Sequence, residues 1–274
     1  MQFFKKPFFV FIIIFSLSCN NHRNTSESIN INPTETTPAI NFTVVNSFPH
    51  DDSLFTEGFL FYNDQLFEST GSPDNLSQTK SVIGIDDLST GKFEKKIELD
   101  KTKYFGEGIS FFKNKLYELT YKNHICFVYD AKTFKLLDSL YYNNAEGWSL
   151  TSDGKNLIMS DGTNKLTYIN PENFHLIKEL NVSENGAPLS NLNELEYING
   201  FIYADVWQTN YIVKIDTSNG NVIGKLDMSS LVHEAQNKNP SADVLNGIAY
   251  DSATDKIYVT GKLWTNIYQV SFPH

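Results

Sequence analysis

Apolar and polar residues alternate with a period of two along most of this chain, in short runs separated by turn residues. The clearest example is the stretch 104–123, YFGEGISFFKNKLYELTYKN, in which two apolar runs flank a turn at Asn114. Alternation of this kind predicts strands, and two short strands around a turn form a hairpin. No window of useful length has apolar residues at i, i+3, i+4 and i+7, so the pattern predicts an all-β fold.

The hairpin pattern occurs five times. The other copies are FTEGFLFYNDQLFESTG from Phe55, AEGWSLTSDGKNLIMSDG from Ala145, LNELEYINGFIYADVWQT from Leu192 and LNGIAYDSATDKIYVTGKLW from Leu245. The first four copies along the chain continue into two further strands around a second turn. Repeats of roughly 40 to 50 residues are typical of solenoids and propellers, and four short strands in each repeat indicate a propeller.

The fifth copy has only a third strand, Ile267–Phe272, after its hairpin. A missing fourth strand would leave an unpaired sheet edge, which proteins seldom tolerate. Residues 41–48, NFTVVNSF, have the character of a strand and could fill the place. We therefore predict that residues 41–274 form one five-bladed β-propeller with four-stranded blades, and that the N-terminal strand closes the ring.

The first 40 residues have a different character. Residues 1–18 combine two lysines with a short apolar run and fit a signal peptide. Residues 16–19, SLSC, resemble the lipobox of bacterial lipoproteins, which predicts lipidation of Cys19; plain secretion with an ordinary cysteine is the alternative. Residues 19–40 are polar and without periodicity, so we expect a flexible tether that leads to an extracytoplasmic, lipid-anchored domain.

Composition excludes several classes of function. The net charge is −10, and the chain has no basic stripe, Gly-rich phosphate loop or Gly-x-Ser-x-Gly motif, so nucleic acid is not expected as a partner. The six histidines show no metal-ligand spacing, so we expect no metal site and no cofactor, although a structural ion in the central channel stays open. Besides Cys19 the only cysteine is Cys126, in an apolar run, where we expect a core residue. We expect a monomer that reaches the membrane through its lipid anchor alone.

Equivalent residues of a propeller converge at the mouths of its central channel. Aligning the five copies on Glu107 places Glu57, Glu146, Glu194 and Asn246 at equivalent positions, so we expect these five side chains to form a ring. Crowded carboxylates raise one another's pKa, and one of them could keep its proton near neutral pH. Such a group can serve as a general acid.

Seven segments carry a more specific signal. They are FTEG at 55–58, YFGEG at 104–108, EGW at 146–148, NLNELE at 191–196, VWQT at 206–209, DVLNGIAYD at 243–251 and VTGKLW at 259–264. Together and in this order they resemble the signature segments of the glutamine cyclotransferase family, the plant and bacterial type of glutaminyl-peptide cyclotransferase. The resemblance implies a five-bladed propeller that converts the N-terminal glutamine of peptides or proteins to pyroglutamate, with release of ammonia and without a catalytic metal.

The resemblance also implies roles for individual residues. Glu107 of FGEG would be the acid that transfers protons, and Asn193 and Lys262 would polarise the side-chain amide of the substrate. Aromatic residues would wall the substrate pocket: Phe55, Phe105, Trp148 and Trp207. The family usually has glutamine in the FTQG segment, where this chain has Glu57. We expect this change to alter how the substrate amide is held, and so to lower activity or shift its pH dependence.

The residue pattern alone leaves structural roles open. Glu107 could bind backbone amides at the inner end of a blade, Trp148 and Trp207 could pack between blades, and Lys262 could pair with a carboxylate of the ring. Two other functions also fit a propeller with an acidic ring. One is a non-catalytic platform that binds peptides, and the other is a metal-dependent hydrolase.

Overall fold

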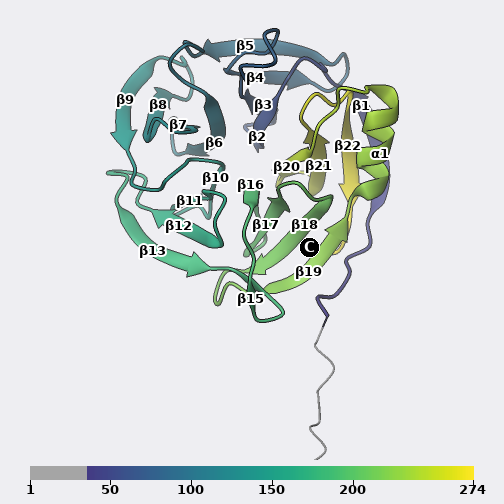
Figure 1. The fold of residues 1–274 in the computed structure, drawn as a ribbon. Helices are drawn as coiled ribbons and strands as arrows, with labels where there is room; N and C mark the ends of the chain where they lie inside the picture. Colours follow the sequence, from purple (N-terminus) through teal and green to yellow (C-terminus); the bar gives the residue numbers. More distant parts are fainter. Residues whose placement is uncertain (1–35) are drawn as a thin grey trace, which may run out of the picture. The chain divides into compact units, whose positions relative to one another are not determined.

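A computed structural model describes residues 36–274 of the protein. Five antiparallel, four-stranded sheets are arranged around a central axis (Figure 1). The fold is a five-bladed β-propeller, as the repeats predicted. The predicted signal peptide, residues 1–18, and Cys19 lie outside the described residues.

Each of the first four blades uses four strands in chain order, from the channel outward. Blade 1 contains β2 (Thr56–Tyr62), β3 (Gln65–Thr70), β4 (Val82–Asp87) and β5 (Lys92–Glu98). Blade 2 contains β6 (Gly106–Phe112), β7 (Lys115–Thr120), β8 (Ile125–Asp130) and β9 (Leu136–Tyr141). Blade 3 contains β10 (Leu150–Ser152), β11 (Leu157–Met159), β12 (Lys165–Ile169) and β13 (Leu176–Asn181). Blade 4 contains β16 (Leu192–Ile198), β17 (Phe201–Val206), β18 (Tyr211–Asp216) and β19 (Val222–Asp227).

The fifth blade closes the ring with strands from both ends of the domain. It contains β20 (Leu245–Asp251), β21 (Lys256–Gly261), β22 (Asn266–Ser271) and, as its outermost strand, β1 (Thr43–Pro49). Strand β1 runs antiparallel to β22, with Thr43 opposite Ser271 and Pro49 opposite Asn266. The prediction that the N-terminal strand supplies the missing fourth strand is therefore confirmed.

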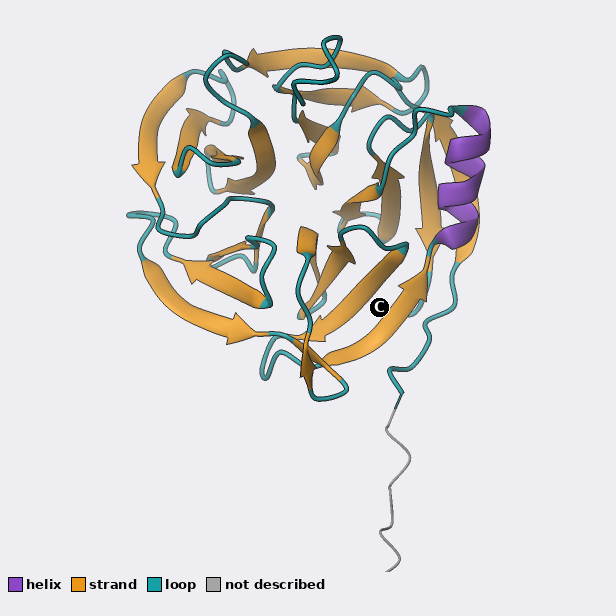
Figure 2. Ribbon diagram, in the orientation of Figure 1, coloured by secondary structure: helices purple, strands orange, loops and turns teal. Residues whose placement is uncertain are grey.

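Two elements were not predicted. Helix α1 (Ser229–Lys238) connects blades 4 and 5 and lies beside the closing blade (Figure 2). It buries Leu231, Val232 and Ala235, so the expectation that the chain has no helix was wrong. A short hairpin of β14 (Ser183–Glu184) and β15 (Ala187–Pro188) connects blades 3 and 4.

The predicted tether, residues 19–40, extends too far into the domain. The backbone N–H of Ile40 donates a hydrogen bond of 2.8 Å to the carbonyl of Lys225, and Ala39 forms a parallel bridge with the same residue. The side chain of Ile40 also packs against the apolar cluster between blades 4 and 5. The end of this segment is thus fixed to the outside of blade 4.

Apolar side chains fill the spaces between neighbouring blades. Between blades 1 and 2, for example, Phe67 and Ile83 pack against Ile109 and Leu116. Cys126 is fully buried between blades 2 and 3, where burial raises its pKa well above the usual value.

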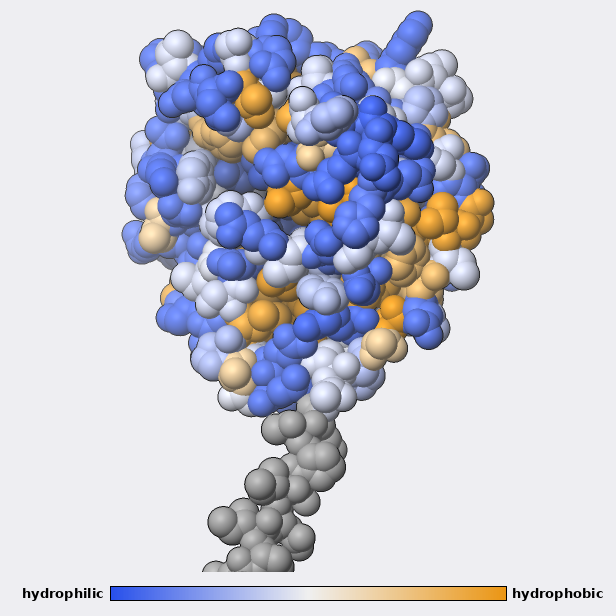
Figure 3. Space-filling model, turned by 45° about the vertical axis from the view of Figure 1, so that its right-hand side comes forward, coloured by the Kyte–Doolittle hydropathy of each residue, from blue (hydrophilic) through white to orange (hydrophobic). Residues whose placement is uncertain are grey.

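On the side of α1 the surface is mostly hydrophilic, with apolar side chains in separate patches (Figure 3). Among residues 36–274, no helix has the length and apolar character needed to cross a bilayer.

The innermost strands share a local irregularity that matters for the site. In β2, β6, β16 and β20 the register with the second strand shifts by one residue near the start of the strand. Such a β-bulge turns the side chains beside it away from the regular alternation. In β2 and β6 the shift falls at Glu57 and Glu107, which are therefore re-aimed at the end of the channel.

Candidate active site

One cavity of about 220 Å³ lies where the innermost strands begin and the second strands end. It is lined by Phe55, Glu57, Pro73, Phe105, Glu107, Tyr121, Trp148, Asn193, Trp207, Asp243 and Lys262. All eight residues to which the sequence analysis gave a catalytic or substrate-binding role are among them. They come from all five blades, so the propeller brings together side chains that are far apart in the sequence.

The register of the strands identifies which residues are truly equivalent. Ile109 pairs with Glu118 in blade 2, and the corresponding pairs in the other blades are Phe59–Glu68, Leu150–Met159, Leu195–Ala204 and Ile248–Val259. Counting back two residues from the inner member of each pair gives the ring at the channel end. It consists of Glu57, Glu107, Trp148, Asn193 and Asn246.

The expected positions of Glu146 and Glu194 in this ring were wrong. Glu146 lies two residues before its blade's ring position and accepts a 2.8 Å hydrogen bond from the indole N–H of Trp148. Glu194 lies one residue after its ring position and is buried in the hub. Its carboxylate accepts hydrogen bonds from the backbone N–H groups of Phe59, at 3.2 Å, and Ile248, at 2.8 Å. Glu194 therefore ties blade 4 to blades 1 and 5.

Lys262 and Glu57 form a buried ion pair inside the cavity. The ammonium Nζ lies 2.7 Å from each carboxylate oxygen, and only 6% of Lys262 and 2% of Glu57 is exposed. The same Nζ lies 4.5 Å from the centre of the Phe55 ring, a cation–π distance. The pairing with a ring carboxylate that the sequence left open is thus the arrangement found. Burial raises the pKa of Glu57, and the charge of Lys262 opposes this rise.

Of the two glutamates that line the cavity, Glu107 has the more strongly raised pKa. Its side chain is 5% exposed, and burial raises its pKa well above the usual value for glutamate. The nearby carboxyl of Glu57 raises this pKa further, through its charge and through a hydrogen bond, whereas Lys262 acts in the opposite direction. Glu107 therefore holds a proton at a pH where an exposed glutamate has lost it.

Two asparagines connect this acid pair to blades 4 and 5. The side-chain N–H of Asn193 donates a 2.7 Å hydrogen bond to Oδ1 of Asn246. The amide of Asn246 in turn donates to the carbonyl of Thr56, at 2.8 Å, and to Oε2 of Glu57, at 3.3 Å. A side-chain amide has two N–H donors, so one N–H of Asn193 is not used in this hydrogen bond.

Aromatic side chains form the walls of the cavity. Phe55 and Phe105 meet edge to face, with ring centres 6.5 Å apart, and Trp148 and Trp207 do the same at 5.5 Å. Gly71 lies directly under Phe105, because a Cβ at this position would be 2.2 Å from the ring. The walls are thus held by packing and can keep a small substrate group away from water.

Three non-glycine residues next to the cavity have left-handed backbone conformations. They are Asn191, Gln208 and Leu263, with φ angles of 65°, 63° and 60°. Gln208 follows Trp207 directly, and Leu263 follows Lys262. This conformation is unfavourable for leucine and persists only where the surroundings impose it, which is common at functional sites.

Sequence reasoning missed three residues of the cavity lining, namely Pro73, Tyr121 and Asp243. Tyr121 follows the second strand of blade 2 at the position that Trp207 has in blade 4 and Lys262 in blade 5. An alignment of the ends of the second strands would have found it. The Tyr121 ring lies 5.7 Å from that of Phe105 and extends the aromatic wall.

The chain was compared with known proteins. A family model described as glutamine cyclotransferase matches residues 12–272. A glutaminyl-peptide cyclotransferase of Arabidopsis thaliana is 38% identical over 229 residues, which cover 83% of this chain and 70% of the plant protein. The crystal structure of Myxococcus xanthus glutaminyl cyclase superposes with a TM-score of 0.77 at 30% identity, over 87% of this chain and 98% of the other.

Fold, cavity and matches together define a propeller enzyme that transfers acyl groups. The chain belongs to the glutamine cyclotransferase family. The family resemblance carried by the seven sequence segments is therefore confirmed, and the protein is a glutaminyl-peptide cyclotransferase.

Proposed function

We propose that the cavity binds the N-terminal glutamine of peptides or proteins and that Glu107 transfers the protons of the cyclisation. The observation that carries this proposal is a buried carboxyl, raised in pKa, on the wall of a small aromatic cavity. The cavity is smaller than the roughly 300–1,000 Å³ of pockets for drug-sized ligands, which suits one terminal residue.

The reaction joins the α-amine of the glutamine to the carbon of its own side-chain amide and releases the amide nitrogen as ammonia. The new C–N bond forms first and leaves an oxyanion on the former amide oxygen. Glu107 donates its proton to the departing nitrogen, and its carboxylate then takes one proton from the attacking nitrogen. The acid is thus restored, and no external proton donor or acceptor is needed.

Other residues of the cavity assist by position and charge. The free N–H of Asn193 and the ammonium of Lys262 stabilise the oxyanion. The ammonium of Lys262 is also paired with the carboxylate of Glu57, which partly neutralises the charge of Lys262 before the substrate binds. The four aromatic residues hold the flexible glutamine in a folded shape in which its amine meets its amide. No resident metal or other cofactor takes part in this mechanism.

The two alternative functions make different demands on the site. A metal-dependent hydrolase would need the ring of carboxylates, but three of its five positions hold Trp148, Asn193 and Asn246. A platform that only binds peptides would need no perturbed acid at Glu107. The cavity therefore fits the cyclotransferase reaction better than either alternative.

The test is to incubate the purified domain with a Gln-initiated peptide and to measure the mass of the product. We expect the loss of one ammonia, and a fall in rate of about 10²–10⁴-fold for Glu107→Gln. Glu196→Gln is the matched control, since Glu196 is a buried carboxyl outside the cavity lining, and its rate should stay close to that of the parent protein. Near-normal turnover by Glu107→Gln would show that the assignment of the acid is wrong.

The cellular location of the protein is a further part of the proposal. The apolar run before Cys19 and the lipobox-like SLSC support a lipoprotein of a bacterial membrane whose catalytic domain is extracytoplasmic. The polar segment after Cys19 would act as a spacer between membrane and propeller. We expect the domain to act as a monomer, because residues of this chain suffice to bring all eight predicted site residues into one cavity.

A further inference from the structure

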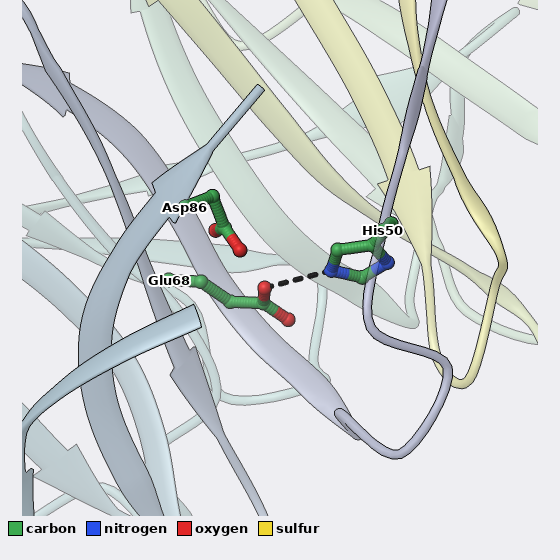
Figure 4. A group of neighbouring side chains, drawn as sticks. All are labelled: His50, Glu68 and Asp86. Atoms are coloured by element: carbon green, nitrogen blue, oxygen red, sulfur yellow. Dashed lines mark hydrogen bonds and ion pairs between the residues drawn. The ribbon is translucent and has the colours of Figure 1, made fainter. Parts of the chain in front are cut away.

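A second group of charged side chains is buried between blade 1 and the closing blade, outside the cavity. His50 follows β1, Glu68 lies on β3 and Asp86 lies on β4, and all three are buried. Their potential ligand atoms all lie within 4.8 Å of one another. Figure 4 shows the two carboxyl groups side by side, with the imidazole of His50 facing Glu68.

The repeats show that the propeller does not require charge at these places. The positions equivalent to Glu68 and Asp86 follow from the strand registers. Blades 3, 4 and 5 have Met159, Ala204 and Val259 in place of Glu68, and Ile169, Ile215 and Val270 in place of Asp86. Blade 2 has Glu118 and Tyr129, and the tyrosine hydroxyl donates a 2.8 Å hydrogen bond to the carboxylate. Among these five sheets, blade 1 alone has a carboxyl group at both positions, and His50, which follows β1 of the closing blade, lies beside them.

The orientation of His50 is that of a metal ligand. Its Nδ1 lies 2.8 Å from the carbonyl oxygen of Trp264, which can only accept, so Nδ1 carries a hydrogen. Nε2 faces the carboxylates and lies 2.9 Å from Oε2 of Glu68. Burial lowers the pKa of His50, but the Glu68 carboxylate outweighs this effect and raises the pKa to about 9, so a metal ion would bind Nε2 by displacing its proton. A backbone carbonyl on the second ring nitrogen is the usual way in which proteins orient a metal-binding histidine.

One carboxyl oxygen of this group has no hydrogen-bond partner. Oε1 of Glu68 accepts a 2.6 Å hydrogen bond from the Thr56 hydroxyl, but Oδ2 of Asp86 is buried without any partner among the described residues. Asp86 is 7% exposed, so solvent does not supply the missing donor. A cation bound here would give this oxygen a partner in a buried site, where an unmatched polar atom is costly.

We propose that His50, Glu68 and Asp86 bind one divalent transition-metal ion, with Zn²⁺ as the best match. One imidazole nitrogen and two carboxylate oxygens suit zinc and similar ions, whereas calcium requires six to eight oxygen ligands. The ion neutralises both carboxylates and occupies the place that Asp86 Oδ2 faces. The site was not predicted from the sequence, because its ligands come from two strands and from the loop after a third, and form no local motif.

The site contacts residues next to Glu57 and Lys262, the buried ion pair of the catalytic cavity. Glu68 holds Thr56, the residue before Glu57, and His50 holds the carbonyl of Trp264, two residues after Lys262. A metal at this point fixes β2 to the loop after β21. We therefore assign it a structural role, in which it joins the first and last blades, and no part in the chemistry of the cavity.

Because the site is buried, the metal has to enter while the chain folds. The experiment refolds the protein from guanidinium with Zn²⁺ alone or with a chelator, removes loosely bound metal by dialysis, and measures zinc content and Tm. We expect one equivalent of zinc and a Tm that is about 5–10 °C above that of the chelator-treated sample, at zinc concentrations near a hundred times Kd. A parallel refolding with Mn²⁺ tests the choice of metal.

Variants separate this site from adventitious zinc. Asp86→Asn and Glu68→Gln keep the shape of each side chain and should lose both the bound zinc and the zinc-dependent rise in Tm. Glu118→Gln changes the equivalent buried carboxyl of blade 2 and should keep both. Far-UV circular dichroism confirms that each variant is folded. The proposal is overturned if the refolded parent protein retains no zinc, or if folded Asp86→Asn retains as much zinc as the parent.

Discussion

The buried pair of Lys262 and Glu57 allows a quantitative prediction about stability and activity. Replacing Lys262 by methionine keeps most of the side-chain volume but leaves Glu57, which is 2% exposed, without its partner. Removal of one member of a buried ion pair costs about 3–5 kcal/mol in free energy of unfolding. For a domain of this size that cost corresponds to a fall in Tm of about 10 °C. Replacing both residues, as in Glu57→Gln/Lys262→Met, removes the uncompensated charge and should recover most of the loss.

The cost of Lys262→Met should depend on pH with a definite sign. Burial already raises the pKa of Glu57 above its ordinary value of 4.5, and the loss of Lys262 raises it further. Above pH 4.5 the native variant then binds a proton that the unfolded chain does not bind, so its stability falls as pH rises. The difference in Tm between parent and variant should therefore be small near pH 5 and larger at pH 7.

The assay is a double-mutant cycle, with Tm and turnover measured for the parent, both single variants and the double variant. If Lys262 also stabilises the oxyanion, the double variant regains stability but not turnover. Destabilisation that simply adds in the double variant would refute the coupling of the pair. Turnover that returns together with stability would refute a role for Lys262 in the reaction. For the single variant Glu57→Gln, the pH dependence of turnover should shift to lower pH, because Glu57 no longer raises the pKa of Glu107.

Two further predictions concern other parts of the chain. Burial raises the pKa of Glu196 to about 8, so the parent protein should lose stability as pH rises from about 5 to 8. In Glu196→Gln, Tm should depend less on pH in this range. If the slope of Tm against pH is the same in both proteins, Glu196 does not titrate there. If Cys19 is lipidated, protein produced with its full N-terminus should partition into detergent and carry acyl chains on its first residue. The variant Cys19→Ser should then be water-soluble. An unmodified Cys19 in the mature protein would favour plain secretion.

The repeats allowed the propeller, the number of blades and the closing strand to be predicted, because alternating apolar residues and turn residues are local signals. The exact alignment of the copies was harder. The dipeptide Glu146-Gly147 looks like Glu107-Gly108, yet Gly147 lies at the position of Gly106. Strand β16 has the same bulge as β6, so Asn193, and not Glu194, is the residue that matches Glu107. The copies had been aligned on an acidic residue, and the side chains that share a position are identified only once the strands are paired.

Other features depended on tertiary contacts that no local pattern encodes. Helix α1 buries only three side chains, so its apolar face is too narrow to stand out in the sequence. The cavity residues with assigned roles could be found because the family resemblance named them. Pro73 and Tyr121 lie outside the seven segments that carry the resemblance, and Asp243 begins one of these segments but was given no role. The charged cluster of His50, Glu68 and Asp86 is recognisable only once the strands of blade 1 and the closing blade are placed side by side.

The chain must be complete before the enzyme can work. Glu57 and Lys262 are 205 residues apart, and β1, made early during synthesis, has no partner until β22 leaves the ribosome. A nascent or C-terminally shortened chain therefore lacks both a closed ring and the ion pair of Glu57 and Lys262. Activity in this protein thus reports on successful completion of folding, and an incomplete product can neither act on peptides nor hide its unpaired edge from quality-control proteases.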